Sequence, residues 1–151
     1  MKQQSLIILK PDCVARGLVG EVTTRFEKKG FKLVGAKMTM LSTEVLTEHY
    51  GHLADKPFFP SILAYMQAAP VMLQIREAEG WIEIIRQLIG ITDPAKAAQW
   101  TIRGDYSINI SCNIIHASET EEEAKQEIAR FFDASDVQEY ERSDTDFLYG
   151  R

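Results

Sequence analysis

The sequence has few of the features that mark disulfide-bonded, membrane-spanning or nucleic-acid-binding proteins. It contains two cysteines, Cys13 and Cys112, which form neither a C-x-x-C pair nor a zinc-binding spacing and indicate reduced thiols. No apolar run approaches the roughly 20 residues that cross a bilayer, and the N-terminus lacks a signal-peptide pattern. The net charge of -5 argues against general nucleic-acid binding. We therefore expect a cytoplasmic protein with neither a membrane partner nor a specific nucleic-acid partner.

Several well-known sequence motifs for nucleotide binding and hydrolysis are also missing. There is no G-x-x-x-x-G-K-[ST] phosphate loop, no G-x-G-x-x-G after a strand, no H-E-x-x-H and no G-x-S-x-G. If the protein binds phosphates, cationic side chains must replace the glycine-rich cradle. His49 and His52 lie close together but lack a clear third ligand, so their signal for a metal site is weak.

Length and composition indicate one globular domain. The chain has 151 residues, of which 45% are hydrophobic and 26% are charged, values that are ordinary for a globular protein with a proper core. No internal repeat, low-complexity tract or linker interrupts it. We therefore expect residues 1–151 to form a single domain.

The first forty residues predict a strand, a helix and a second strand. The branched apolar run SLIIL (5–9) is typical of a buried strand. Apolar residues at helical spacing then lead from Leu18 to Phe26, and Gly30 stands where a helix would end. Residues 31–40 favour a second strand.

The remaining segments predict further helices and strands in alternation. Apolar periodicity is lost from Ile91 to Ser111, which indicates either a misinterpreted segment or a functional loop. A capping box fits Ser118 with Glu121, and Thr120 with Glu123 fits equally well. The order of elements predicts an α+β sandwich of the split-βαβ kind. The elements expected are an interrupted helical segment (43–66), a strand (70–77), a helix (81–90), a short strand (112–116) and a helix (120–132).

The stretch NIIHAS places a histidine, His116, where a buried strand gives way to a helix. A histidine here either simply ends the strand or serves as a reactive group at the strand-to-helix junction. The acidic residues that follow suit the N-terminus of the next helix.

Three cationic side chains have positions that suit a polyphosphate. Lys10 directly follows the first strand, Arg86 lies on a predicted helix, and Arg103 lies in the segment without periodicity. Arginine binds phosphate oxygens bidentately, whereas lysine acts as a point charge. Each cation alone also fits a solvated surface position. Hydrogen-bonding side chains in or beside the irregular segments favour a site, namely Tyr50, Thr92 and Asn113.

The aromatic pair Phe58-Phe59 stands between two prolines in KPFFP. It either anchors a loop or exposes one ring on which a nucleobase stacks.

Six ordered motifs together resemble the nucleoside diphosphate kinase family. They are KPDCVARGLVGEV, EHY, KPFF, TDPAKA, TIRGDY and NIIHAS, and they extend from about Ser5 to Phe132. The resemblance implies a ferredoxin-like α/β sandwich, with a four-stranded antiparallel sheet covered by helices. This fold agrees with the order of elements above.

The resemblance also implies an activity and a set of partners. The family moves the γ-phosphate of a nucleoside triphosphate to a nucleoside diphosphate, in a ping-pong cycle through a phosphohistidine. Its Mg²⁺ is carried by the nucleotide phosphates and needs no protein ligand, and the family implies a homo-oligomer, a tetramer or a hexamer.

Matching the motifs position by position assigns roles to eleven residues. His116 becomes the nucleophile, and Ser118 and Glu127 become the shell that fixes its imidazole ring. Phe58 would stack on the base, with Ile62 beside it. The residues assigned to phosphates or sugar are Lys10, Tyr50, Arg86, Thr92, Arg103 and Asn113.

The chain departs from the family pattern at three places. Gln99-Trp100 replaces the usual Pro-Gly in a loop that commonly takes part in subunit contacts, and the C-terminus reads DFLYGR. Cys13 occupies a position where small residues are common, as either an oxidisable thiol or a packed small residue. None of these changes falls on a residue assigned to chemistry.

Overall fold

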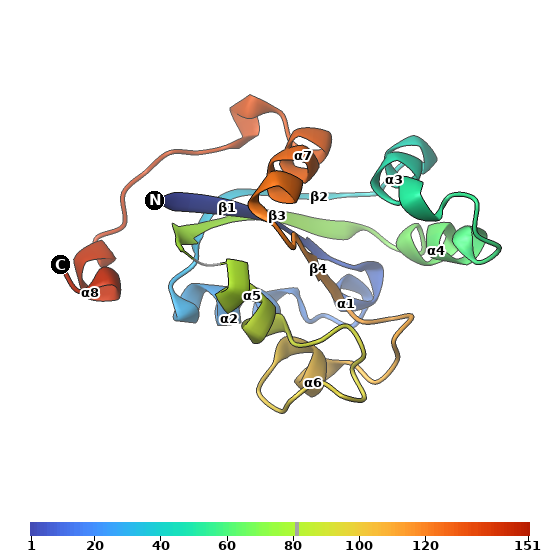
Figure 1. Cartoon of the computed structure of the whole chain (residues 1–151), viewed down its shortest axis with the longest axis horizontal. Coiled ribbons are helices and arrows are strands. Elements are labelled where there is room, and N and C mark those ends of the chain that lie inside the picture. Colours follow the sequence, from blue (N-terminus) through green and yellow to red (C-terminus); the bar gives the residue numbers. More distant parts are fainter. Residues whose placement is uncertain (81) are drawn as a thin grey trace.

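The computed structural model describes residues 1–80 and 82–151, and its centre is a four-stranded sheet (Figure 1). The strand order is β2-β3-β1-β4, and each neighbouring pair is antiparallel. The strands are β1 (Lys2–Leu9), β2 (Lys32–Thr39), β3 (Val71–Glu79) and β4 (Ile115–Ala117). This topology confirms the predicted α+β, ferredoxin-like sandwich.

Helices cover both faces of the sheet (Figure 1). Alternate residues of β1 point to opposite faces, so Ile7 and Leu9 join one hydrophobic core while Leu6 and Ile8 join the other. The first core packs against α2 (Val19–Lys29), α5 (Ile82–Ile89) and α6 (Ile102–Tyr106), and the second against α3 (Thr43–His49), α4 (Phe59–Met66) and α7 (Glu121–Phe131). Burial on both faces explains the continuous apolar run in β1.

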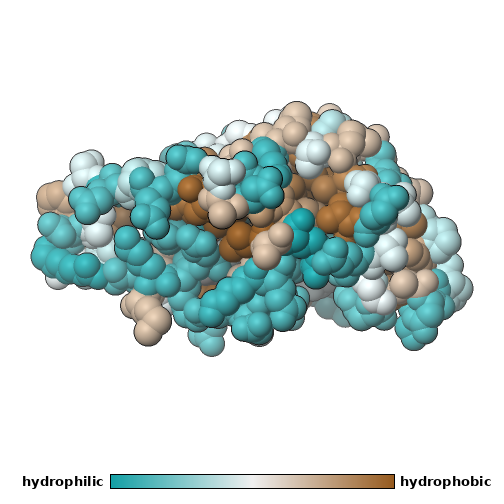
Figure 2. Space-filling view, turned by 90° about the horizontal axis from the view of Figure 1, so that it is seen from above, coloured by the Kyte–Doolittle hydropathy of each residue, from teal (hydrophilic) through white to brown (hydrophobic). Residues whose placement is uncertain are grey.

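The surface is mainly hydrophilic on the side of α7 (Figure 2). Hydrophilic residues gather at the left and along the lower edge of this view, and hydrophobic residues are exposed across its centre and upper right (Figure 2).

Helix ends with clear chemical signals lie where the sequence predicts them. Gly30 ends α2 in a left-handed conformation, with φ of 103°, which a residue with a side chain adopts reluctantly. At α7 the side chain of Thr120 accepts from the backbone N–H of Glu123, so Thr120 is the N-cap, while the Glu123 carboxylate accepts from the N–H of Glu119 and the reciprocal bond of a capping box is not formed. The predicted helix 81–90 is confirmed over α5, and its first residue, Trp81, lies outside the described residues.

Short elements were missed or misplaced. The strand predicted over 112–116 is wrong at its start, because β4 begins at Ile115. Residues 91–111 contain α6, which is capped by Thr101, so part of that segment was misinterpreted as irregular. The missed elements are α1 (Pro11–Ala15), two 3₁₀ turns (Gly51–Leu53 and Ala134–Asp136) and α8 (Thr145–Tyr149). Three to five residues show too little periodicity to reveal a helix.

Pairing of β4 with β1 brings His116 beside the end of the first strand. In this pairing Ile8 lies opposite His116, and Leu9 lies opposite Ile115. Lys10, the residue after β1, therefore lies beside β4 and close to His116. The expected closeness of Lys10 and His116 therefore comes from the antiparallel register.

Other features of the described residues bear on the predictions from composition. Within residues 1–80 and 82–151, no helix combines the length and apolarity of a membrane span. Cys13 and Cys112 are free thiols, the first buried and the second exposed. Burial, assisted by Asp12, raises the pKa of Cys13 to about 12, so this residue is a packed small side chain.

Candidate active site

A cavity of about 410 Å³ lies where β1, β4, α5, α6 and α7 meet. It collects most of the side chains that the sequence singles out. Eight of the eleven predicted site residues line it: Lys10, Tyr50, Arg86, Thr92, Arg103, Asn113, His116 and Glu127. Residues far apart in sequence therefore share one polar pocket.

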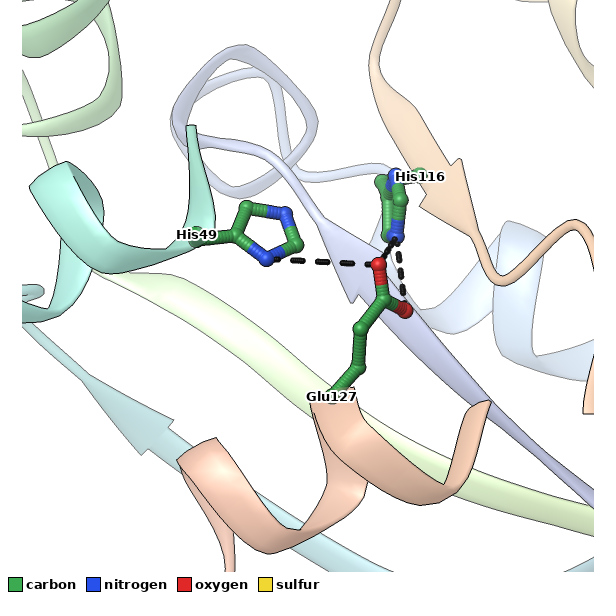
Figure 3. Close-up of side chains that lie close together, drawn as sticks. All are labelled: His49, His116 and Glu127. Atoms are coloured by element: carbon green, nitrogen blue, oxygen red, sulfur yellow. Dashed lines mark hydrogen bonds and ion pairs between the residues drawn. The ribbon is translucent and has the colours of Figure 1, made fainter. Parts of the chain in front are cut away.

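The two ring nitrogens of His116 have different environments (Figure 3). Nε2 lies 2.9 Å and 3.0 Å from the two carboxylate oxygens of Glu127, on α7. The other nitrogen, Nδ1, points away from the carboxylate (Figure 3). Because a carboxylate accepts hydrogen bonds, this contact favours the tautomer with the proton on Nε2 and a lone pair on Nδ1.

Glu127 is itself held in place. The Ser118 hydroxyl donates to its Oε2 at 2.7 Å, while the backbone N–H of Leu6 donates to the Ser118 oxygen at 3.1 Å. Burial alone would raise the pKa of Glu127, but the hydrogen bonds from His116 and Ser118 outweigh it and hold that pKa below its usual range. A charged carboxylate, held by Ser118, therefore lies next to the imidazole ring.

The backbone is strained two residues before the histidine. Ile114 has φ of 59°, in the left-handed region that β-branched residues avoid. The N–H of Ile115 donates to the carbonyl of Asn113 at 2.8 Å, which closes a γ-turn around Ile114. The turn is retained because its neighbours hold it, since Lys10 donates its backbone N–H to the Ile114 carbonyl at 2.9 Å.

The ammonium of Lys10 lies in the cavity and is fixed by Asn113. Lys10 Nζ donates to Asn113 Oδ1 at 2.7 Å, and the Asn113 amide donates to the carbonyl of Thr92 at 3.3 Å. Burial, and then the charge of Arg103, lowers the pKa of Lys10 to about 8. A buried ammonium whose pKa is lowered in this way would be stabilised by a bound anion.

Arg103 organises the backbone around the cavity. Its guanidinium donates to the carbonyls of Gly90, Asn113 and Ile115, at distances of 3.0, 3.3 and 2.7 Å. Burial, and then Arg86, lowers its pKa to about 10. Three of its five N–H groups are engaged in this way, so two remain for an anion.

Two carboxylates at the rim of the cavity were not anticipated. Arg86 forms an ion pair with Glu119 at 3.0 Å, and both side chains are largely exposed. The carboxylate of Glu123 accepts from the backbone N–H of Glu119 at 2.7 Å. An incoming phosphate would compete with Glu119 for Arg86. In the sequence, both glutamates look like ordinary residues of a helix start.

His49 is another residue near the His116 ring that sequence reasoning missed. Its ring lies edge-on to that of His116, with centroids 5.1 Å apart. Burial, and then His116, lowers the pKa of His49 to about 4, so it is neutral. In the described part of the chain, the ligand atoms of His49, His116 and Glu127 lie close enough together to hold a metal ion. However, Nδ1 of His49 already accepts a hydrogen bond from Arg130 at 3.1 Å. A hydrogen-bonded imidazole cluster describes them better than a metal site.

The aromatic residue expected to meet a base lies outside the cavity. Phe58 precedes α4 and is 49% exposed, and Ile62 follows one turn later on the same side of the helix. Phe59, its neighbour, is buried and acts as the anchor. In the pair Phe58-Phe59, one ring therefore lies in the core and the other is exposed at the surface.

The loop with the unusual Gln99-Trp100 sequence adopts a left-handed backbone. Trp100 has φ of 72° and is 84% exposed. Its carbonyl accepts from Arg25 at 3.0 Å, its N–H donates to Asp105 at 2.9 Å, and Arg25 also pairs with Asp105. The loop is therefore fastened to α2, and α6 with Arg103 follows it in sequence.

These contacts define the chemistry that the site can perform. The imidazole ring of His116 lines a cavity bordered by one ammonium and two guanidinium groups, and its Nε2 is backed by a carboxylate. Such a site accepts a phosphoryl group and stabilises the positive ring that results. The fold and the site together define an α+β protein with a cationic, phosphate-binding pocket and a histidine inside it.

Comparisons with known proteins agree with this class. The nucleoside diphosphate kinase family model matches residues 3–137. Relatives include a nucleoside diphosphate kinase of Methanosphaera stadtmanae, 44% identical over 99% of this chain and 98% of that protein, and one of Parabacteroides distasonis, 46% identical over 97% and 96%. A halophilic nucleoside diphosphate kinase from Halobacterium salinarum in complex with CDP superimposes with a TM-score of 0.94, at 38% identity and 99% coverage of both chains. The chain belongs to the nucleoside diphosphate kinase family.

Proposed function

We propose that the protein transfers the γ-phosphate of a nucleoside triphosphate to a nucleoside diphosphate through a phosphohistidine at His116. The observation that carries this proposal is the position of the His116 ring, with Nε2 held by Glu127 at 2.9 Å and Nδ1 directed away from it. The lysine and both guanidinium groups line the same cavity, so an attacking nitrogen and anion-binding groups converge there.

The reaction has two symmetrical halves. The lone pair of His116 Nδ1 attacks the γ-phosphorus, and the bond between that phosphorus and the β–γ bridging oxygen breaks. The nucleoside diphosphate leaves with that electron pair, and the positive charge of the ring is balanced by Glu127. In the second half, a terminal oxygen of the acceptor diphosphate attacks the phosphorus, and the N–P bond breaks to restore the neutral ring.

The other cavity residues bind and orient the nucleotide. Lys10 and the free N–H groups of Arg86 and Arg103 neutralise oxygens whose charge is spread in the loose transition state. Tyr50, Thr92 and Asn113 supply hydrogen bonds to phosphates or sugar.

Outside the cavity, Phe58 stacks on the base beside Ile62. Stacking without hydrogen bonds to base edges predicts tolerance of different bases.

Mg²⁺ would reach the site with the nucleotide. The described residues contain no cluster of carboxylates that could enclose the ion, since the group of potential ligands found there is the imidazole cluster with Glu127. Phosphate oxygens would therefore hold it, as Mg²⁺ prefers hard oxygen ligands, and it would neutralise phosphate charge.

Assembly, domain organisation and location belong to the same proposal. Residues 1–151 act as one domain in the cytoplasm and assemble as a homo-oligomer. Trp100 and Ile108, 84% and 94% exposed, supply apolar surface that contacts between copies would cover.

A chase experiment tests the function. Protein incubated with γ-labelled ATP and freed of nucleotide should carry an acid-labile, base-stable phosphate. Addition of unlabelled GDP should then move the label to GTP without further ATP. Label that stays on the protein, or is released only as inorganic phosphate, would contradict transfer between nucleotides.

The lowered pKa of Lys10 predicts a loss of activity at alkaline pH. Lys10 is charged below pH about 8 and loses its charge above it. We expect kcat/KM for ATP to fall by up to about tenfold per pH unit above that value, and Lys10→Arg to extend the plateau to higher pH, because an arginine stays charged. Kinetics from pH 6 to 10 provide the measurement.

Unfolding would not explain this loss. A lysine with a lowered pKa costs the folded state stability while it is charged, and the cost diminishes between pH 8 and 10.5, as the unfolded state holds the proton longer. The contribution of Lys10 to stability therefore improves with pH over the range where activity declines. If kcat/KM fell at the same pH in the wild type and in Lys10→Arg, the charge of Lys10 would not be the cause of the alkaline loss of activity.

A further inference from the structure

A side-chain hydrogen bond joins α4 to α1 outside the cavity. The hydroxyl of Tyr65 donates to Oδ1 of Asp12, while Oδ2 of Asp12 is buried and has no hydrogen-bond partner within the described residues. Burial, and then the hydrogen bond to Asp12, raises the pKa of Tyr65, so its hydroxyl remains the donor. Neither side chain lines the cavity around His116.

The two partners belong to opposite ends of the proposed nucleotide site. Lys10 is the N-cap of α1, two residues before Asp12. Phe58, Ile62 and Tyr65 are spaced i, i+4 and i+7 along α4, so they share one side of that helix. The hydrogen bond thus connects the helix that carries the base platform to the turn that carries the phosphate-binding lysine.

We propose that Tyr65 and Asp12 are a positioning pair that sets the spacing between the base-binding helix and Lys10. This inference rests on the proposed function, since a nucleotide must engage both ends of the site at once. A fixed spacing prepares the site before binding and reduces the ordering that the nucleotide must bring about. The pair acts on nucleotide binding and leaves the chemistry at His116 Nδ1 unchanged.

Loss of the tyrosine hydroxyl would also leave Asp12 without its partner. The carboxylate already has one buried oxygen, Oδ2, without a donor, and Oδ1 would then lose its donor too, which is costly for a charged group. Asp12 already favours the charged form of Lys10 through its own charge. Without this hydrogen bond α4 would be held less firmly against α1, so the spacing between Phe58 and Lys10 would vary.

Tyr65→Phe tests the pair, and Tyr140→Phe is a matched control. Tyr140 also donates its hydroxyl, to the carbonyl of Leu33, but it lies in the C-terminal segment and is 47% exposed. We expect Tyr65→Phe to raise KM for ATP about tenfold while kcat at saturation stays within about threefold of the wild type. The control should match the wild type in both constants.

A phosphate donor that has no nucleobase distinguishes loss of nucleotide positioning from disruption of the site around His116. Phosphoramidate phosphorylates histidines directly, so its rate of labelling His116 should be equal in the wild type and in Tyr65→Phe. A parallel fall in labelling by phosphoramidate and by ATP would overturn the pair's role, because it would show a damaged site. Unchanged KM in Tyr65→Phe would overturn it as well.

Asp12→Ala gives a second test that holds if the phenylalanine variant does not fold. The alanine removes the acceptor of the Tyr65 hydroxyl, so KM for ATP should rise with phosphoramidate labelling preserved. An unchanged KM would overturn the proposal. Wild-type protein that takes no phosphate from ATP would instead overturn the proposed function, and this inference with it.

Discussion

His116→Ala should abolish the phosphoenzyme and lower kcat for phosphate exchange by at least about four orders of magnitude. The attacking atom is removed, and the other imidazole beside Glu127, that of His49, lies 3.9 Å from the carboxylate with its Nδ1 already accepting a hydrogen bond from Arg130. Loss of a nucleophile leaves only the binding and electrostatic part of catalysis. Exchange between labelled ATP and GDP, with acid- and base-stability of the protein-bound label, provides the measurement.

His52→Ala is a suitable control for this variant. His52 lines the same cavity but has no carboxylate partner among its described contacts. Its replacement should leave labelling within a few-fold of the wild type. Full labelling of His116→Ala, or equal losses in the two variants, would remove His116 from the centre of the mechanism.

The parts of the fold that the sequence predicts well are those with repeated signals. The run 5–9 is apolar at every position after Ser5, and the helix that ends at Gly30 shows both periodicity and a glycine stop. Burial of whole faces imposes these patterns, so they can be read without a structure. The cavity residues could be predicted because Lys10 directly follows the first strand and because the motifs that resemble the family contain Arg103 and His116.

The parts that could not be predicted depend on contacts between distant segments. Ile114 looks like one more strand residue, yet it forms a γ-turn because Lys10 and Asn113 hold its neighbours. His49 looks like a surface histidine at a helix end, but α7 and the ring of His116 bury it. No local pattern shows that the Tyr65 hydroxyl meets Asp12, 53 residues away.

Glu127→Gln should slow phosphorylation of His116 about 100-fold. The amide still has one oxygen that accepts from Nε2, but it has no negative charge to balance the ring when Nδ1 gains a phosphoryl group. Hydrogen bonds to a charged partner are about twice as strong as neutral ones, and the difference appears mainly as the ring becomes positive. Rapid-quench labelling with γ-labelled ATP at saturation measures this step directly.

Two comparisons separate the charge of Glu127 from its role in packing. Ser118→Ala removes one hydrogen bond to the carboxylate but keeps the charge, so the slowing should be only about threefold. Replacement of a buried charge by an isosteric amide need not destabilise the fold, so the melting temperature of Glu127→Gln should stay close to that of the wild type. A glutamine variant that is phosphorylated as fast as the wild type would show that orientation of the ring, and not compensation of its charge, is what Glu127 supplies.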